Sequence, residues 1–198
     1  VAVLNLGGVA NITLIGEGDE MLAYDTGPAN GMIDLWVQAR SGARFDEDGL
    51  LAAAGQVDAA ALTALLDHPY FAAPGPKSLD RYDFPLTPVE ALSIEDGAAT
   101  LTAFTAETVA MAVRNTPARP TVLVACGGGR HNPTLMAALR DRAGVPVKSA
   151  EDAGWRGDSI EAEAFAYLAA RTARGLPISF PGTTGVAKPM TGGMIVRP

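Results

Sequence analysis

Asp25 is the residue whose type and position most directly suggest chemistry. It follows the segment 21–24, which is predicted to be a short strand, and it precedes Thr26-Gly27-Pro28, after which a helix begins. A carboxylate at such a strand end can take a proton from an attacking water or hydroxyl, or hold Mg²⁺. The same tripeptide is common in ordinary turns, so a carboxylate that caps a turn is an equally good interpretation.

A glycine pair, Gly7-Gly8, joins the first two predicted strands, 1–6 and 9–15. Two strands joined by such a short turn form an antiparallel hairpin. Because glycine has no side chain, the N–H groups of the pair can face outward and approach a phosphate. Taken alone, an ordinary tight turn is the more common explanation.

Three glycines, Gly127-Gly128-Gly129, separate the apolar segment 121–125 from the predicted helix 133–142. Asn132 can cap this helix, with Pro133 as its first residue. A glycine loop between a buried strand and a helix is a common setting for nucleotide binding. Neither GxxxxGK[ST] nor GxGxxG is present, so the loop is a weak signal by itself.

Glu161 lies in the predicted helix 159–174, on one stripe with Phe165 and Leu168. This spacing of i, i+4 and i+7 predicts that Glu161 projects from the core-facing side. Burying an unpaired carboxylate costs several kcal/mol, so Glu161 should meet a cation, a donor or a ligand. The alternative is a glutamate favoured by the positive end of the helix dipole.

The proline-rich segment 68–88 is predicted to be an ordered but irregular loop. It carries Lys77 and Arg81, which could hold a sugar or a phosphate. Charged side chains exposed to solvent are the ordinary alternative for such a loop.

The elements that must position these residues begin with an antiparallel meander of strands 1–6, 9–15 and 21–24. Helical and strand-loop-helix patterns follow, which predicts an α/β fold with a mixed sheet and helices packed on it. The further expected helices are 32–39, 50–54, 59–66, 99–114, 133–142 and 159–174, and the further strands are 121–125 and 145–148.

Composition excludes several classes of protein. The chain has 198 residues, 48% of them hydrophobic and 19% charged, enough for a folded core. Its 22 acidic and 15 basic residues give a net charge of −7, which disfavours nucleic acid and anionic membranes as partners. The single Cys126 excludes an internal disulfide, and we expect a small buried thiol in a cytoplasmic protein. No apolar run approaches the roughly 20 residues that cross a bilayer.

Together the motifs resemble the carboxyl-terminal part of the anhydro-N-acetylmuramic acid kinase family, within the actin-like ATPase superfamily. The resemblance runs nearly end to end and is far more specific than any one motif. It is carried by segments 5–11, 25–30, 68–71 with 76–78, 99–102, 127–129 with Asn132, and 158–162 with 165–166.

The resemblance implies an actin-like, ribonuclease H-like lobe. Residues 1–198 would be the carboxyl-terminal lobe of a two-lobed sugar kinase, and the chain opens in mid-strand without the amino-terminal lobe that covers the ATP phosphates. We therefore expect the chain alone to bind ligands weakly and to turn over little. After Lys77-Ser78 the chain departs from the family's frequent Thr-Gly-Arg-Glu, with Leu79-Asp80-Arg81-Tyr82 instead.

The resemblance also implies a reaction. ATP with Mg²⁺ and water would open 1,6-anhydro-N-acetylmuramic acid and yield N-acetylmuramic acid 6-phosphate and ADP, in peptidoglycan recycling in the bacterial cytoplasm. Asp25 would be the base that activates water, no residue is assigned to hold a metal, and a homodimer is left open. The phosphate- and nucleotide-binding residues would be Gly7, Gly8, Asn11, Gly127, Gly128, Gly129 and Asn132. The substrate-binding residues would be Thr26, Gly27, Asn30, Lys77, Arg81 and Glu161.

Two alternatives to a kinase differ in how well they fit the sequence. A non-catalytic actin-like module that binds nucleotide or a partner fits a chain without a first lobe. A dinucleotide-binding domain does not fit, because the first strand pair is antiparallel and no GxGxxG is followed by a ribose-binding acid.

Overall fold

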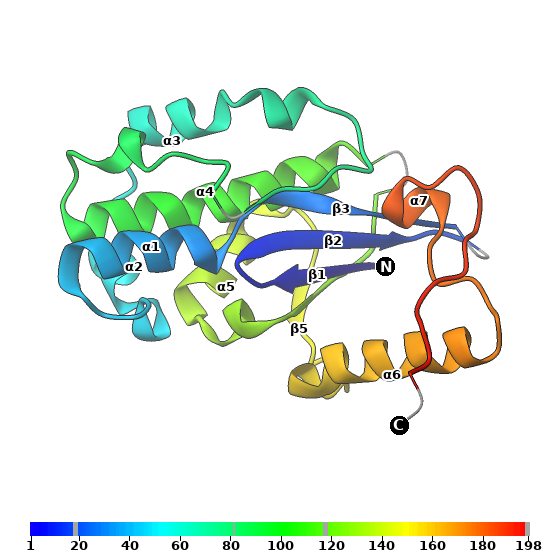
Figure 1. Cartoon of the computed structure of the whole chain (residues 1–198). Helices are drawn as coiled ribbons and strands as arrows, with labels where there is room; N and C mark the ends of the chain where they lie inside the picture. Colours follow the sequence, from blue (N-terminus) through cyan, green and yellow to red (C-terminus); the bar gives the residue numbers. More distant parts are fainter. Residues whose placement is uncertain (18–19, 81, 117–118, 197–198) are drawn as a thin grey trace.

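The described part of the chain forms a five-stranded sheet with helices on it, strand order β3-β2-β1-β4-β5 (Figure 1). The computed structural model describes residues 1–17, 20–80, 82–116 and 119–196. The strands are β1 (Ala2–Leu6), β2 (Val9–Ile15), β3 (Met21–Pro28), β4 (Leu123–Cys126) and β5 (Val147–Ser149). The α-helices are α1 (Asn30–Ser41), α2 (Leu50–Ala54), α3 (Ala59–Leu66), α4 (Ile94–Arg114), α5 (Pro133–Arg142), α6 (Ile160–Ala173) and α7 (Pro181–Thr184).

The first three strands form the predicted antiparallel meander. β1 pairs with β2 through the Gly7-Gly8 turn, and β2 pairs with β3. β3 differs from the prediction, because it continues through Asp25 to Pro28 instead of ending at Tyr24. It is an edge strand of the sheet, where a proline is tolerated.

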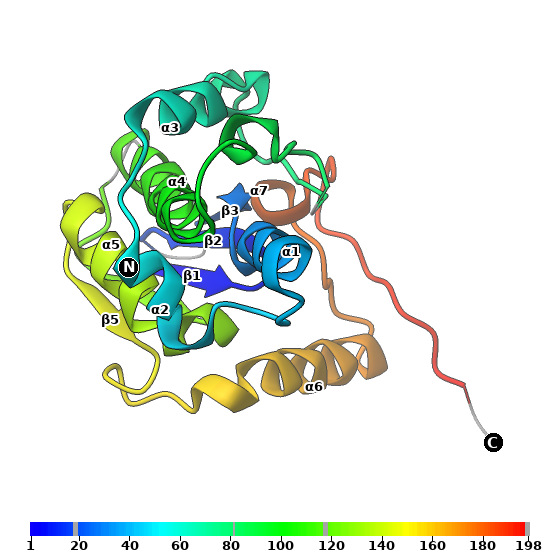
Figure 2. The ribbon, with the colours of Figure 1, turned by 90° about the vertical axis from the view of Figure 1, so that its left-hand side faces the viewer.

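β4 pairs with the other side of β1, and β5 pairs with β4; both pairings are parallel. α4 and α5 cover one face of the sheet, and α6 lies on the opposite side (Figure 2). The predicted mixed sheet that begins with an antiparallel meander is therefore confirmed by strand order and direction. The core between sheet and helices includes Leu4, Leu6, Ile12, Val109, Val113, Leu123, Leu135 and Leu139.

The long helix α4 begins at Ile94, five residues before the predicted start at 99. Ser93 caps it, since its Oγ accepts a hydrogen bond from the N–H of Asp96 at 3.0 Å. A second apolar cluster joins α4 to α1, α2 and α3 around Trp36 and Phe104, which are 1% and 0% exposed. α4 thus belongs to both apolar clusters and connects them.

The short helices α2 and α3 pack through few residues, Ala52 in the former and Ala61 with Leu65 in the latter.

Among the described residues, no helix alone is long and apolar enough to cross a membrane. The pair Glu47–Ala54 and Ala59–Leu66 meets that test only jointly, with a bend of 117°.

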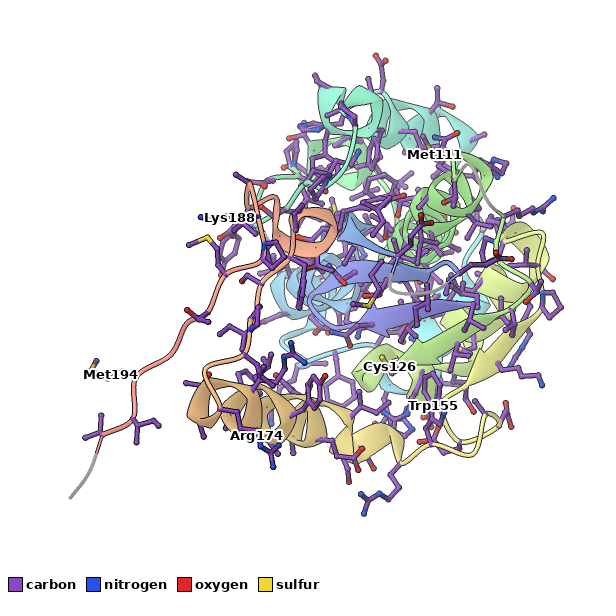
Figure 3. The ribbon with its side chains drawn as sticks, turned by 90° about the vertical axis from the view of Figure 1, so that its right-hand side faces the viewer. Met111, Cys126, Trp155, Arg174, Lys188 and Met194 are labelled. Carbon is purple, nitrogen blue, oxygen red and sulfur yellow. The ribbon has the colours of Figure 1, made fainter. Side chains whose placement is uncertain are left out.

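α6 stands apart from the core. None of its residues is buried, and Phe165 and Tyr167 are 65% and 61% exposed. The prediction that Glu161 projects toward a core is therefore wrong. Periodicity shows which residues share a helix face, and on this face Leu168 is half-buried while Glu161 and Phe165 are exposed. The chain beyond Gly192 also extends away from the body, with Met194 85% exposed (Figure 3).

We predict that Gly97→Ala destabilises the fold. A Cβ at this position would lie 2.3 Å from the Cε2 and Cζ2 atoms of Trp36, so the buried indole must shift. The expected loss is about 1–3 kcal/mol of unfolding free energy, measured by urea denaturation. Gly128→Ala is the matched control, because a Cβ there has nothing within 4 Å, and its change should stay within about 0.5 kcal/mol. Equal stability of the two variants would contradict this packing.

Candidate active site

Four side chains form a row across the sheet, on the face turned away from α4 and α5. On one side, Asn5 of β1 pairs with Cys126 of β4. On its other side Asn5 pairs with Asn11 of β2, and Asn11 pairs with Asp25 of β3. Side chains alternate between the faces of a sheet, so these four share one face. We call Asp25, Asn11, Asn5 and Cys126 the polar row. Cys126 is buried as predicted, and burial raises the pKa of its thiol.

Asp25 is held through both of its carboxylate oxygens and through its backbone. Asn11 Nδ2 donates to Oδ1 at 2.9 Å, and the N–H of Leu79 donates to Oδ2 at 2.8 Å. The hydroxyl of Tyr70 donates to the carbonyl of Asp25 at 2.6 Å, and the Asp25 N–H donates to the carbonyl of Lys77 at 3.0 Å. Burial, and then the charge of Asp25, raises the pKa of Tyr70, which keeps its hydroxyl a donor. The carboxylate therefore has a fixed orientation on β3.

An irregularity in the pairing of β3 decides which residues face the polar row. The pairing of β2 with β3 shifts at Asn11, so that Thr26 is an extra residue on β3. Thr26 is 3% exposed, and its Oγ1 donates to a backbone carbonyl of β2 at 3.2 Å. A Cβ on Gly27 would lie 2.5 Å from Thr108 Oγ1 of α4. Asp25 thus faces the polar row, whereas Thr26 and Gly27 contact the protein interior.

The Gly7-Gly8 turn packs against the start of α1. The carbonyl of Gly8 accepts hydrogen bonds from the N–H groups of Ala29 and Gly31, and that of Gly7 accepts one from Asn30, all at 3.1 Å. The turn therefore satisfies N–H groups that a helix start leaves unpaired. The N–H of Gly7 donates within the turn at 3.2 Å, while no acceptor among the described residues takes the N–H of exposed Gly8. The turn offers a ligand one N–H group, fewer than the pair predicted from the sequence.

The Gly127-Gly128-Gly129 loop connects β4 to α5, as predicted. Gly127 has a φ of +76°, and a Cβ on it would lie 2.3 Å from Asn5 Oδ1. A Cβ on Gly129 would lie 2.7 Å from the Cβ of Leu6. These two residues approach β1 closely because they are glycines. Gly128 is exposed, and its outer side is open.

Gly128 and Gly129 line a cavity of about 300 Å³. This volume is at the lower end of ordinary small-molecule sites. Asn132 lies at the cavity and caps α5 as predicted, since its Oδ1 accepts the N–H of Leu135 at 2.9 Å. Phe45, 51% exposed, presents an aromatic ring that a flat group can stack on. The other lining residues are Asn30, Ile33, Asp34, Asp46, Asp48 and His131.

The charged residues that were expected to contact a sugar differ in where the structure places them. The ammonium of Lys77 donates to the carbonyls of Tyr70 at 2.7 Å and Ala73 at 2.8 Å and lies over the Tyr70 ring. Burial lowers the pKa of Lys77. Glu161 is exposed in the first turn of α6, and Arg81 lies outside the described residues. Lys77 is thus engaged within its own loop, and that loop holds Asp25.

Arg130, which follows the glycine loop, is a buried cation with a side chain 3% exposed. Its guanidinium donates to Glu151 at 2.9 and 3.0 Å, to Asp158 at 2.5 Å, and to the carbonyl of Gly127 at 2.9 Å. His131 Nε2 lies 3.5 Å from Asp158. The hydrogen bonds from Arg130 lower the pKa values of both carboxyls. We call Arg130, Glu151 and Asp158 the Arg130 cluster.

Comparison with known proteins decides the family. The family described as anhydro-N-acetylmuramic acid kinase matches residues 1–198. The chain belongs to the anhydro-N-acetylmuramic acid kinase family. A relative of that name from Caulobacter vibrioides is 71% identical, over 99% of this chain and 53% of the relative. Another from Phenylobacterium zucineum is 63% identical, over 100% of this chain and 54% of the relative. The chain spans about half the length of the curated relatives it matches.

Solved structures give a more distant likeness. The activator of the 2-hydroxyisocaproyl-CoA dehydratase from Clostridium difficile, with bound ADPNP, is 15% identical. The matched region covers 75% of this chain and 53% of the activator, with a TM-score of 0.46. Neither function nor ligands of this chain follow from a similarity at that level.

Several residues of the site were not predicted from the sequence. Asn5 is an exposed polar residue in an otherwise apolar strand, which is the signal that could have found it. Leu79 contributes only a backbone N–H, and Tyr70 contacts a backbone carbonyl, so their residue types carry no such signal. Arg130 follows the glycines directly, but its partners lie 21 and 28 residues later.

We predict that the Arg130 cluster makes stability depend on acidity. The ordinary pKa values of the Glu151 and Asp158 carboxyls, 4.5 and 3.8, are lowered in the folded state. Their contribution is therefore complete above about pH 5 and is lost as pH falls through the lowered values. The unfolding free energy of Arg130→Met should fall less steeply between about pH 5 and 3 than that of the unchanged chain, measured by urea denaturation.

Arg114→Met is the matched control, because Arg114 pairs with Glu107 on the surface, where an ion pair contributes little. It should keep the acid dependence of the unchanged chain. The same slope in all three proteins would show that the Arg130 cluster does not form.

Proposed function

We propose that the chain is part of an ATP-dependent kinase that opens 1,6-anhydro-N-acetylmuramic acid with water and forms N-acetylmuramic acid 6-phosphate and ADP. The polar row carries this proposal. Asn11 and Leu79 orient the Asp25 carboxylate on the sheet face near the ends of β1 and β4, where the two glycine segments follow. Membership of the kinase family supports it. Since ATP is the donor, we assign the reaction to the bacterial cytoplasm, in peptidoglycan recycling.

In the proposed reaction, Asp25 accepts a proton from the water that attacks the anomeric carbon. The bond from that carbon to the 6-oxygen breaks, and the 6-oxygen attacks the γ-phosphorus of ATP while ADP leaves. Asn11 and the Leu79 N–H each occupy one lone pair of the carboxylate. Each oxygen keeps a further lone pair, so the fixed carboxylate can still accept the proton.

The nucleotide is proposed to lie between the glycine loop and the glycine turn. The cavity beside Gly128 would receive adenosine, with the Phe45 ring available for stacking. Carboxylates that line the cavity, such as Asp48, would accept hydrogen bonds from ribose hydroxyls and repel phosphate. The phosphates would therefore lie toward the unpaired N–H of Gly8.

Mg²⁺ would accompany the ATP phosphates. Among the described residues, no group of three or more His, Cys, Asp or Glu could hold a metal ion. The polar row nevertheless offers oxygen atoms of Asp25, Asn5 and Asn11, the hard donors that suit Mg²⁺ together with phosphate and water. When bound, Mg²⁺ supplies neutralisation of the phosphate charge.

We also propose that residues 1–198 form the carboxyl-terminal lobe of a two-lobed kinase. The chain spans 53% of the Caulobacter relative, so nearly half of that relative has no counterpart here. A further lobe would cover exposed apolar side chains of α6 such as Phe165, which is 65% exposed. Of the predicted substrate-side residues, Asn30, Arg81 and Glu161 remain proposed contacts. Lys77 acts through the loop that holds Asp25, whereas Thr26 and Gly27 pack β3 against the protein interior.

The proposed function is tested in a chimera in which this chain replaces the matching residues of the Caulobacter relative. The chimera should release ADP only when the anhydro sugar is present. Asp25→Asn should lower kcat by about 10²- to 10⁴-fold, because the amide cannot accept the proton. A coupled ADP-release assay measures both results.

Asp141→Asn is the matched control, because Asp141 is exposed on α5 and away from the polar row. It should leave turnover unchanged. Sugar-dependent turnover that survives Asp25→Asn would overturn the assignment of the base. A chimera that binds ADP but never consumes ATP would favour a non-catalytic nucleotide-binding module.

We predict that the 198-residue chain alone releases ADP at least about 100-fold more slowly than the chimera. The reason is that the ATP phosphates would be contacted from one side only. The same assay at equal protein concentration measures this difference. Comparable rates would show that the chain needs no second lobe.

A further inference from the structure

Arg130 connects two segments that are far apart in the chain. On one side its Nη1 donates to the carbonyl of Gly127 in the glycine loop at 2.9 Å. On the other side its Nη2 donates at 2.5 Å to Asp158, in the 3-10 turn (Gly157–Ser159) that leads into α6. Glu151 receives the remaining hydrogen bonds from Nε and Nη2. The guanidinium is thus a direct link between the glycine loop and the start of α6.

Stability alone is a weak reason for this arrangement. Burying a cation costs several kcal/mol, and a well-packed apolar side chain often stabilises such a position equally well. The feature that an apolar side chain cannot supply is direction. A planar guanidinium fixes several acceptors at defined angles at once, here the Gly127 carbonyl and two carboxylates.

The start of α6 has few other attachments. None of the residues of α6 is buried, and its first residue, Ile160, is only half-buried, so apolar packing holds the first turn weakly. Asp158 lies two residues before the start of α6, and Glu161 follows three residues after Asp158. The position of Glu161 therefore depends on the bond between Asp158 and Arg130, with His131 at 3.5 Å from the same carboxylate.

We propose that Arg130 is a positioning residue that joins the glycine loop to the first turn of α6, so that nucleotide bound at the loop sets the position of Glu161 on the sugar side. The proposal rests on the proposed kinase function, because it takes the loop as the nucleotide side and Glu161 as the sugar side. Arg130 itself contacts neither ligand in this proposal.

Asp158→Asn tests the link from its α6 end, because Arg130 keeps its bonds to Glu151 and Gly127. In the chimera, kcat/KM for the anhydro sugar should fall about tenfold, while the dissociation constant for ADP stays within about twofold. Glu163→Gln is the matched control, since Glu163 pairs with Arg156 on the exposed side of the same helix. It should change neither value. Equal kinetics of the two variants, or a parallel loss of ADP affinity and melting temperature in Asp158→Asn, would overturn the proposal.

Trp155 provides a readout that needs no turnover. It lies between Glu151 and Asp158 in the sequence and is 41% exposed (Figure 3). Trp36, in contrast, is buried in the core. ADP should change the part of the chimera's fluorescence that Trp155→Phe removes, and Asp158→Asn should abolish that change. An ADP response that is absent, or that is retained in Asp158→Asn, overturns the link. A normal response in a chimera without sugar-dependent turnover rejects the kinase function and leaves the link standing.

Discussion

The pairing of β1 with a different partner on each side is the constraint on which the site depends. Its antiparallel register with β2 brings Asn5 opposite Asn11, and its parallel register with β4 brings the Gly127 loop onto Asn5. A slip of one residue in either register would turn these side chains to the other face of the sheet. The buried leucines of β1 prevent that slip, since the same slip would expose them. The core thus fixes the geometry of the polar groups on the open face.

Around Asp25, two of the four hydrogen bonds described above have backbone partners. The Leu79 N–H and the Lys77 carbonyl come from the loop, while Asn11 and Tyr70 contribute side-chain atoms. This explains how the loop after Lys77 can depart from the sequence frequent in the family and still hold the carboxylate. Side-chain identity matters less where the peptide unit makes the hydrogen bond.

Local patterns predicted much of the fold and part of the site. The hairpin, the glycine loop and the Asn132 cap were foreseen because each is determined by residues close in sequence. The continuation of β3 to Pro28 was not, because it depends on β3 lying at a sheet edge. The face of α6 could not be foreseen either, since periodicity assumes a partner for the apolar stripe. The links of Arg130 to Glu151 and Asp158 are long-range pairings that no local pattern encodes.

Cys126 has a practical consequence. It is the single thiol of the chain, it lies at one end of the polar row with 4% of its surface exposed, and its pKa is raised by burial. Alkylating reagents require an accessible thiolate, so the native thiol should be nearly inert toward them. A cysteine introduced on the surface could then carry a spin label or a dye in a background that needs no prior removal of native sulfur.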